Sequence, residues 1–274
     1  MTFFDNFASI RLIAAHRGFR GHFPENTMAA FLASIGRCHF LELDVQMSRD
    51  NVPMVIHDPT LERTSDARLQ RQSLGVRSLR VGEWNLEQLK KLDCGSWFVA
   101  TDPFATIADG SVTVDDLRRL PPQRMPTLEE VLTHPALSKV PINVEIKDHK
   151  GRPQHQHVAE TVIAVIKKAR AVERVLISSF NHDYLAIVKT FAPKVSVGVL
   201  QDGQHPEDLL EYLHALKASA YHPSEAIIDP ATVKELRAAG FGVNVYTVNS
   251  PQRQRELFAM GVTAIFTDFP SLPA

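Results

Sequence analysis

The sequence predicts a (β/α)8 barrel. Short apolar runs alternate with helical segments in units of about 25–30 residues, which is typical of parallel strands joined by helices. About eight such units fit into the 274 residues of the chain, and a barrel of this kind needs about 250 residues. An open doubly wound sheet is the alternative. It usually carries a glycine-rich loop after its first strand, and this chain has His16-Arg17-Gly18 at that place.

The elements follow one another in a regular order. After the first strand, Asn26 or Thr27 can cap a helix that Gly36 ends. The predicted strands lie at 11–15, 39–45, 52–56, 140–146, 175–180, 194–200, 219–222, 242–248 and 263–267. Between the later strands, helices are predicted at 156–171, 181–192, 206–217, 230–240 and 251–260.

Residues 59–125 interrupt this alternation. The stretch is polar, has no strong strand–helix unit and contains a pair of prolines. We interpret it as a small insertion in the loop after the strand that ends at His57. The next helix begins at Thr127, and Glu130 completes a capping box there. We expect residues 1–274 to form a single domain.

The composition excludes several classes of protein. The 44% of hydrophobic and 22% of charged residues are ordinary for a globular protein. A net charge of −1 argues against binding nucleic acid by charge. Cys38 and Cys94 are too few for a disulfide scaffold. Since we find no signal peptide and no apolar run of membrane-spanning length, we expect a cytoplasmic protein with free thiols. The sequence does not indicate an oligomeric state.

Acidic side chains gather at the predicted strand ends, where a parallel barrel has its active site. Glu42 and Asp44 lie two residues apart and share one face of a strand, and Glu145 and Lys147 repeat this spacing on another. Three carboxylates in one barrel mouth repel each other, and a hard divalent cation compensates them. We favour Mg²⁺ over Ca²⁺, because Mg²⁺ suits a few protein ligands with several waters. For any one of these residues a salt bridge is the alternative.

Two histidines add acid–base chemistry. His16 and His57 each follow a predicted strand, and a pair of imidazoles can supply one base and one acid at neutral pH. Arg17 and Lys147 add positive charge and donors for an oxyanion such as phosphate. With a metal ion, this set indicates metal-assisted phosphoryl chemistry.

Six motifs occur in order from about Ile13 to Pro270: IAAHRG, PENTMAAF, ELDVQMSRDNVPMVIHDPTLERTSD, NVEIK, VYTVN and TDFP. Together they resemble the motifs of the glycerophosphodiester phosphodiesterase family. The resemblance implies a TIM barrel with a small insertion after the strand that bears the second histidine. The stretch 59–125 lies at that place.

The resemblance also implies an activity: hydrolysis of glycerophosphodiesters to sn-glycerol 3-phosphate and an alcohol, with a divalent cation, in lipid metabolism. The residues that match the family's motifs are His16 and His57 as catalytic groups, Glu42, Asp44 and Glu145 as metal ligands, and Arg17 and Lys147 as phosphate contacts. Tyr246 stands where family members commonly have Trp, so an aromatic wall for the glycerol is kept with a hydroxyl added.

Two other functions are alternatives. A lysophospholipase D would need an apolar surface for an acyl chain, and the insertion offers Trp84, Trp97, Phe98 and Phe104 among many charges. A non-catalytic phosphodiester-binding protein would lack part of the catalytic set. The sequence leaves open the headgroup alcohol, which histidine is the acid, and whether water or the glycerol 2-hydroxyl is the nucleophile. It also leaves open whether residues 99–125 shape access for the alcohol or form a surface loop.

The other polar residues near strand ends have plainer interpretations. His149, His155 and His157 are expected in a solvated loop, and His222 is expected to be a hydrogen-bonded histidine at the rim. Asp268 is expected to be a cap or turn residue. Arg63 could orient the insertion through a salt bridge.

Overall fold

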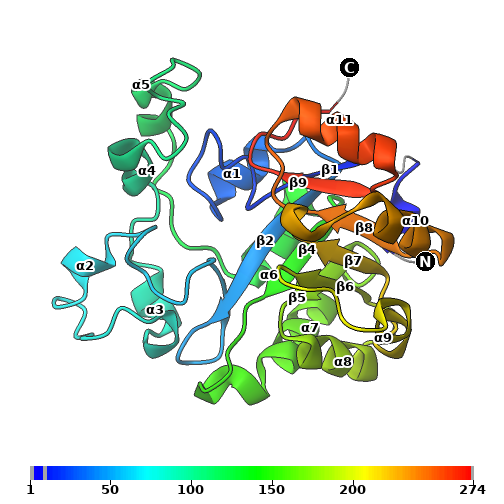
Figure 1. Cartoon of the computed structure of the whole chain (residues 1–274). Helices are drawn as coiled ribbons and strands as arrows, with labels where there is room; N and C mark the ends of the chain where they lie inside the picture. The colour runs from blue at the N-terminus through cyan, green and yellow to red at the C-terminus, as the bar shows by residue number, and fades with distance from the viewer. Residues whose placement is uncertain (1–2, 9–10, 273–274) are drawn as a thin grey trace.

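Eight parallel strands close into a barrel in the structure, a computed structural model that describes residues 3–8 and 11–272 (Figure 1). Neighbours follow the order β1-β9-β8-β7-β6-β5-β4-β2, and β2 pairs with β1 to close the ring. The strands are β1 (Leu12–Ala15), β2 (Phe40–Met47), β4 (Ile142–Ile146), β5 (Val175–Ser179), β6 (Ser196–Gln201), β7 (Ala220–Pro223), β8 (Gly242–Val245) and β9 (Ala264–Thr267). The predicted (β/α)8 fold is confirmed.

Helices surround the barrel (Figure 1). They are α1 (Met28–Ala33), α6 (Leu128–Thr133), α7 (Val158–Lys168), α8 (His182–Phe191), α9 (Leu209–Ala215), α10 (Pro230–Ala238) and α11 (Pro251–Met260). Short 3-10 helices lie at Phe3–Asn6, Val81–Glu83, Pro135–Leu137, Pro153–Gln156 and Glu225–Ile227. The predicted capping box is present, because Thr127 accepts the Glu130 N–H and Glu130 accepts the Thr127 N–H.

The strand predicted at 52–56 runs in the opposite direction to the barrel strands. This strand, β3 (Pro53–Val55), pairs antiparallel with the end of β2 and has no other strand neighbour in the part of the chain that the structure describes. Because β2 is eight residues long, the hairpin extends past the barrel and returns to its mouth. There the Ile56 N–H donates to the Asp44 carbonyl, so the hairpin places His57 next to the candidate metal ligands.

The insertion packs around a small core of its own and projects to one side of the barrel (Figure 1). Its helices are α2 (Ala67–Gln70), α3 (Leu86–Leu89), α4 (Ser96–Thr101) and α5 (Val114–Arg118). Trp84 is fully buried in that core. Residues 99–125 contact the loops after β1 and β9, because Thr106 donates a buried hydrogen bond to the Gly21 carbonyl and Phe104 packs against Phe269.

Residues 3–8 cover the barrel end opposite the mouth. Phe3 is buried with Phe40 and Phe266 in a separate apolar cluster. Its main-chain N–H donates to Ser196 Oγ at the start of β6.

Among the helices of residues 3–8 and 11–272, none has the length and apolar character needed to cross a membrane. Cys38 and Cys94 are free, as predicted, and the cytoplasmic location stays a prediction.

Gly198 makes room inside the barrel for the ring of His222, which is fully buried. A Cβ at position 198 would lie 2.4 Å from His222 Nε2. We expect Gly198→Ala to lower the free energy of unfolding by about 1–3 kcal/mol, the usual cost of overpacking a core. Gly203→Ala is the control, since its Cβ would meet nothing within 4 Å. Urea unfolding measures both, and equal stability of the two variants would contradict the expected steric conflict.

Candidate active site

A pocket of about 180 Å³ opens at the carboxyl ends of the strands. Such a volume suits a small polar molecule, since sites for drug-sized ligands occupy about 300–1,000 Å³. The lining residues are His16, Arg17, Glu42, His57, Asn143, Glu145, Lys147, Ser178, Phe180, Leu200, Tyr246, Thr247 and Phe266. Seven of the eight predicted site residues are among them, and the eighth, Asp44, is buried two residues after Glu42 on β2.

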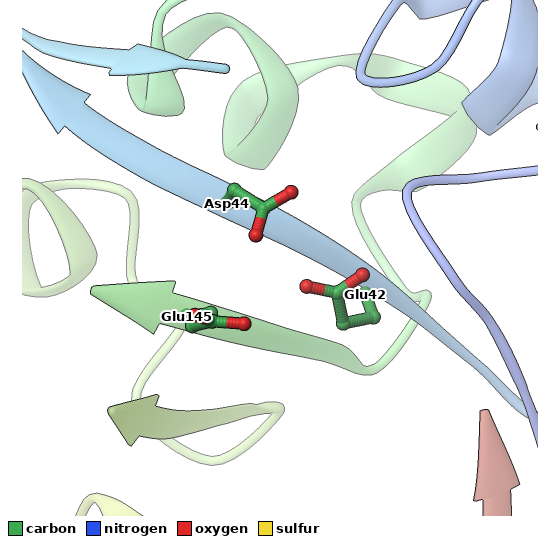
Figure 2. A group of neighbouring side chains, drawn as sticks. All are labelled: Glu42, Asp44 and Glu145. Carbon is green, nitrogen blue, oxygen red and sulfur yellow. The ribbon is translucent and has the colours of Figure 1, made fainter. Parts of the chain in front are cut away.

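Three carboxylates point into one space beside this pocket (Figure 2). Glu42 and Asp44 come from β2 and Glu145 from β4, and the residues Asp44 and Glu145 are register partners in the sheet. One oxygen from each carboxylate lies within 4.8 Å of the other two. Asp44 Oδ1 is buried and receives no hydrogen bond from the described residues. This all-oxygen donor set, with an oxygen left unsatisfied, fits a hard divalent cation.

The electrostatics of the cluster favour a bound positive charge. Burial, together with the charges of Asp44 and Glu145, raises the pKa of Glu42 well above its usual value. Burial also raises the pKa of Glu145. Burial opposes the ionisation of Asp44 as well, but Lys147 and Arg17 outweigh it and lower that pKa. A positive charge between the two glutamates would therefore favour their ionised forms.

Lys147 lies directly against these carboxylates. Its ammonium group forms an ion pair with Glu145 and lies 3.4 Å from Asp44 Oδ1. The predicted phosphate contact is therefore also a partner of two candidate metal ligands. Because its side chain lines the same pocket, its charge is available to an anion bound there.

A buried carboxylate orients His16. Asp268 Oδ1 lies 2.8 Å from His16 Nδ1, and Asp268 Oδ2 accepts a hydrogen bond of 2.8 Å from the Asn249 side chain. Burial lowers the pKa of His16 to about 4, although Asp268 acts in the opposite direction. His16 is thus neutral at pH 7. With Nδ1–H donating to Asp268, Nε2 is the basic nitrogen of the ring.

His57 has a similar arrangement on the other side of the pocket. Asp58 Oδ1 lies 2.6 Å from His57 Nδ1. Arg63, from the insertion, donates from Nε to Asp58 Oδ2 at 2.7 Å. Burial raises the pKa of Asp58, but the hydrogen bonds from His57 and Arg63 outweigh it and keep that pKa below its usual value. The salt bridge predicted for Arg63 is confirmed, and it ties the insertion to a candidate catalytic histidine.

The segment after β1 donates hydrogen bonds to two of the three carboxylates. Arg17 has a positive φ of 55°, and its main-chain N–H donates to Glu42 Oε2 at 2.8 Å. Asn26 has the same φ, and its side-chain amide donates to Asp44 Oδ2 at 2.8 Å. Residues other than glycine adopt this left-handed conformation infrequently. Here it aims two donors at the candidate metal ligands.

Aromatic side chains form one wall of the pocket. Phe180 and Tyr246 meet edge to face with their ring centroids 6.1 Å apart. The Tyr246 hydroxyl donates to the Gln201 carbonyl, so the ring is fixed from outside the pocket. The aromatic wall predicted for Tyr246 therefore includes Phe180 as a second, more exposed member.

The sequence matches a known family, the "Glycerophosphoryl diester phosphodiesterase family", over residues 16–272. The chain belongs to this family. The predicted resemblance is therefore confirmed, and this phosphodiesterase is an enzyme of that class. Membership of an enzyme family argues against the alternative of a non-catalytic binding protein.

Two bacterial relatives match this phosphodiesterase over nearly their whole length. A glycerophosphodiester phosphodiesterase of Bacillus altitudinis is 34% identical over 263 residues, which cover 94% of each chain. One from Caldanaerobacter subterraneus is also 34% identical over 263 residues, with 94% of each chain covered. A solved phosphodiesterase of Oleispira antarctica, in complex with the product sn-glycerol-3-phosphate, has a TM-score of 0.80 and 25% identity. It covers 98% of this chain and 96% of its own.

Some polar residues of this phosphodiesterase lie elsewhere than predicted. His149 is buried rather than solvated, and its Nε2 accepts the Met47 N–H. His155 pairs with the Tyr184 hydroxyl, and His157 is exposed as expected. His222 lies inside the barrel, not at its rim. None of these side chains lines the site pocket.

Four residues important to the site were missed or misinterpreted in the sequence. Asp268 was expected to be a cap or turn residue, but it holds His16. Asp58, Asn26 and Glu25 were given no role in the site. The sequence feature that could have pointed to Asp58 is its position directly after His57. For Glu25 and Asn26, that feature is their position as adjacent residues just before the helix cap Thr27.

Proposed function

We propose that this protein hydrolyses glycerophosphodiesters to sn-glycerol 3-phosphate and an alcohol, with the help of a divalent cation. One observation carries the proposal: two histidines, each paired with a carboxylate, line the same small pocket as a cluster of three carboxylates. The Oleispira antarctica phosphodiesterase with bound sn-glycerol-3-phosphate supports the choice of product. The corresponding role is recovery of glycerol 3-phosphate from deacylated lipids.

The cation would be held by Glu42, Asp44 and Glu145, and we favour Mg²⁺ because few protein ligands with several waters suit it. When bound, the cation supplies Lewis-acid stabilisation of the charge that develops on the phosphate. The protein's part is to orient the ligands. Asn26 holds Asp44, and the Arg17 main chain holds Glu42.

The histidines move the protons. Asp268 and Asp58 each accept the Nδ1–H of one imidazole, so that both rings present Nε2 to the substrate. One histidine takes the proton of the nucleophile, which is water or the glycerol 2-hydroxyl. The other gives a proton to the leaving alcohol. This division of labour is ordinary general acid–base catalysis by two positioned histidines.

The substrate's charged and carbon parts have separate places. Arg17 and Lys147 border the acidic cluster and would attract the phosphate. Tyr246 and Phe180 form the apolar wall against which the glycerol carbons would lie. These contacts would set the substrate between the two histidines.

The insertion argues for a small substrate rather than a lysophospholipid. Its aromatic residues, which an acyl chain would need, are already engaged. Trp84 and Phe98 are fully buried. Phe104 packs on Phe269 and below Arg20, and Trp97 lies below Arg63.

Release of glycerol 3-phosphate from glycerophosphocholine tests the proposal. We expect product with Mg²⁺, loss of product in EDTA, and recovery when Mg²⁺ is added back in excess. Ca²⁺ in parallel compares the two cations, and lysophosphatidylcholine compares the second substrate class. No product from glycerophosphocholine with either cation would overturn the proposed activity. Product only from lysophosphatidylcholine would favour a lysophospholipase D.

A further inference from the structure

Glu25 is a buried carboxylate on which three arginines converge. It lies in the loop between β1 and α1, and its side chain is only 3% exposed. Arg17, Arg20 and Arg63 each place a guanidinium nitrogen within 3.2 Å of its oxygens. Burial raises the pKa of Glu25, but the hydrogen bond from Arg63 and the three arginine charges outweigh it and lower that pKa to about 2. Glu25 is therefore a fixed negative charge among three positive ones.

The first arginine leads to His57. Arg63 binds Glu25 with two parallel hydrogen bonds, from Nη1 at 2.9 Å and from Nη2 at 2.7 Å. The same guanidinium donates to both oxygens of Asp58, at 2.7 and 3.1 Å. Asp58 in turn holds His57. Because the Arg63 side chain is 42% exposed, its position depends on these two carboxylates.

The second arginine leads to His16. Arg20 Nη2 lies 3.2 Å from Glu25 Oε2, and its Nε lies 3.6 Å from Asp268 Oδ1. Asp268 is the carboxylate that orients His16. Glu25 thus reaches the second histidine through an arginine and an aspartate as well, here by an ion pair between Arg20 and Asp268 rather than by hydrogen bonds.

The third arginine leads to the acidic cluster. Arg17 Nη1 donates to Glu25 Oε1 at 2.9 Å, and its Nε lies 3.3 Å from Asp44 Oδ2. A rigid guanidinium that bridges two carboxylates fixes the distance between them. Arg17 therefore joins Glu25 to one of the candidate metal ligands.

We propose that Glu25 is a positioning residue that, through its three arginines, aligns both candidate catalytic histidines and one carboxylate of the acidic cluster. The role of the aligned groups rests on the proposed function; the alignment itself does not. Glu25 accepts a hydrogen bond from Arg17, a candidate phosphate contact, and acts on the two histidines and on Asp44 through the arginines. Without its charge, three like-charged guanidinium groups would repel one another and draw Asp58, Asp268 and Asp44 into new positions.

Glu25→Gln is the first test, because it keeps the shape of the side chain and removes its charge. We expect kcat for glycerophosphocholine to fall by about 10- to 100-fold, the usual cost of losing an outer partner, with a much smaller change in KM. In NMR spectra, the imidazole Nδ1–H signals of His16 and His57 should both move. These signals report alignment without turnover, so a purely structural role elsewhere would not move them.

Glu130→Gln is the matched control. Glu130 also joins the insertion to the barrel, through Lys90 at 2.7 Å, but this pair makes no contact with either histidine or its aspartate. Glutamine also keeps the capping box at this position. We expect wild-type kcat and unmoved histidine signals in this variant.

Arg63→Met breaks the contacts that lead from Glu25 to His57 and leaves those that lead to His16. It also provides a test if Glu25→Gln fails to fold. It should move the His57 signal and leave the His16 signal in place. When both changes are combined, the loss of kcat should be smaller than the product of the single losses, since they break one network. An unmoved signal of either histidine in Glu25→Gln, or an unmoved His57 signal in Arg63→Met, would overturn the proposal. A wild-type protein that releases no glycerol 3-phosphate would refute the proposed function instead, and the NMR signals would still test the positioning.

Discussion

His16→Ala and His57→Ala are each expected to lower kcat for glycerophosphocholine by at least about 10²–10⁴-fold, the usual contribution of one acid or base. Each ring lines the pocket, and each is held at Nδ1 by its own aspartate. Alanine removes both the proton-transferring nitrogen and the group that the aspartate orients. Rates of glycerol 3-phosphate release at saturating Mg²⁺ measure the effect.

A substrate with a nitrophenol leaving group assigns the acid and the base. Nitrophenolate leaves without a proton, so the variant that lacks the acid should recover most of its rate on such a diester. The variant that lacks the base should stay impaired. His157→Ala is the control, because this histidine is exposed and outside the pocket. Loss of less than tenfold in both site variants would refute the acid–base roles.

Glu42→Gln is expected to weaken cation binding strongly while it stabilises the metal-free protein. Loss of an outer partner of a metal ligand alone costs about 10- to 100-fold in affinity, so loss of a ligand charge should cost at least 100-fold. The Arg17 N–H that Glu42 accepts can still donate to the glutamine oxygen. Calorimetric titration with Mg²⁺ measures the affinity.

The pH dependence follows from the direction of the pKa shift. Burial, Asp44 and Glu145 raise the pKa of Glu42 above its usual 4.5 in the folded state. The folded state then holds this proton more tightly than the unfolded state, so the contribution of Glu42 to stability is lost as the pH rises through the folded-state value. Metal-free Glu42→Gln should therefore exceed the wild type in stability at pH 8, and the difference should shrink toward pH 4.5.

Added Mg²⁺ should make the wild type more stable than Glu42→Gln at pH 8. A ligand at 100 times its Kd stabilises the folded protein by about 2.7 kcal/mol, and only the wild type should gain it. Thermal unfolding at pH 8, with EDTA and with Mg²⁺, measures both halves of the prediction. Asp50→Asn serves as the control, because this carboxylate binds Ser48 and the Leu86 N–H outside the site. A Glu42→Gln variant that gains as much stability from Mg²⁺ as the wild type would contradict the assigned metal site.

Local patterns in the sequence were enough to predict the barrel and most of the pocket. Alternate residues on a strand share a face, so the spacing of Glu42 and Asp44, repeated at Glu145, is sufficient to direct all three toward one mouth. Strand ends in a parallel barrel meet at one rim. The place of His16 after the first strand therefore predicts its position as well.

Contacts between distant loops could not be predicted in this way. Asp268 is 252 residues from His16 in the chain. The local sequence around Asp268 is that of an ordinary turn, and it is the same whether or not a histidine lies next to the carboxylate in the folded protein. Only closure of the barrel brings β9 beside β1 and sets the two side chains 2.8 Å apart. The direction of β3 was missed for a similar reason, because a short apolar run has the same pattern in a hairpin as in a barrel strand.

By itself, the sequence determined the fold class, the family and seven of the pocket-lining residues, because each depends on periodicity or on short motifs within one element. The tertiary structure alone decided how those residues are held. The aspartates behind the histidines and the convergence of three arginines on Glu25 depend on where loops from separate units meet. Loop paths are set by packing and by charge pairing between segments far apart in the chain, and a local pattern does not encode either.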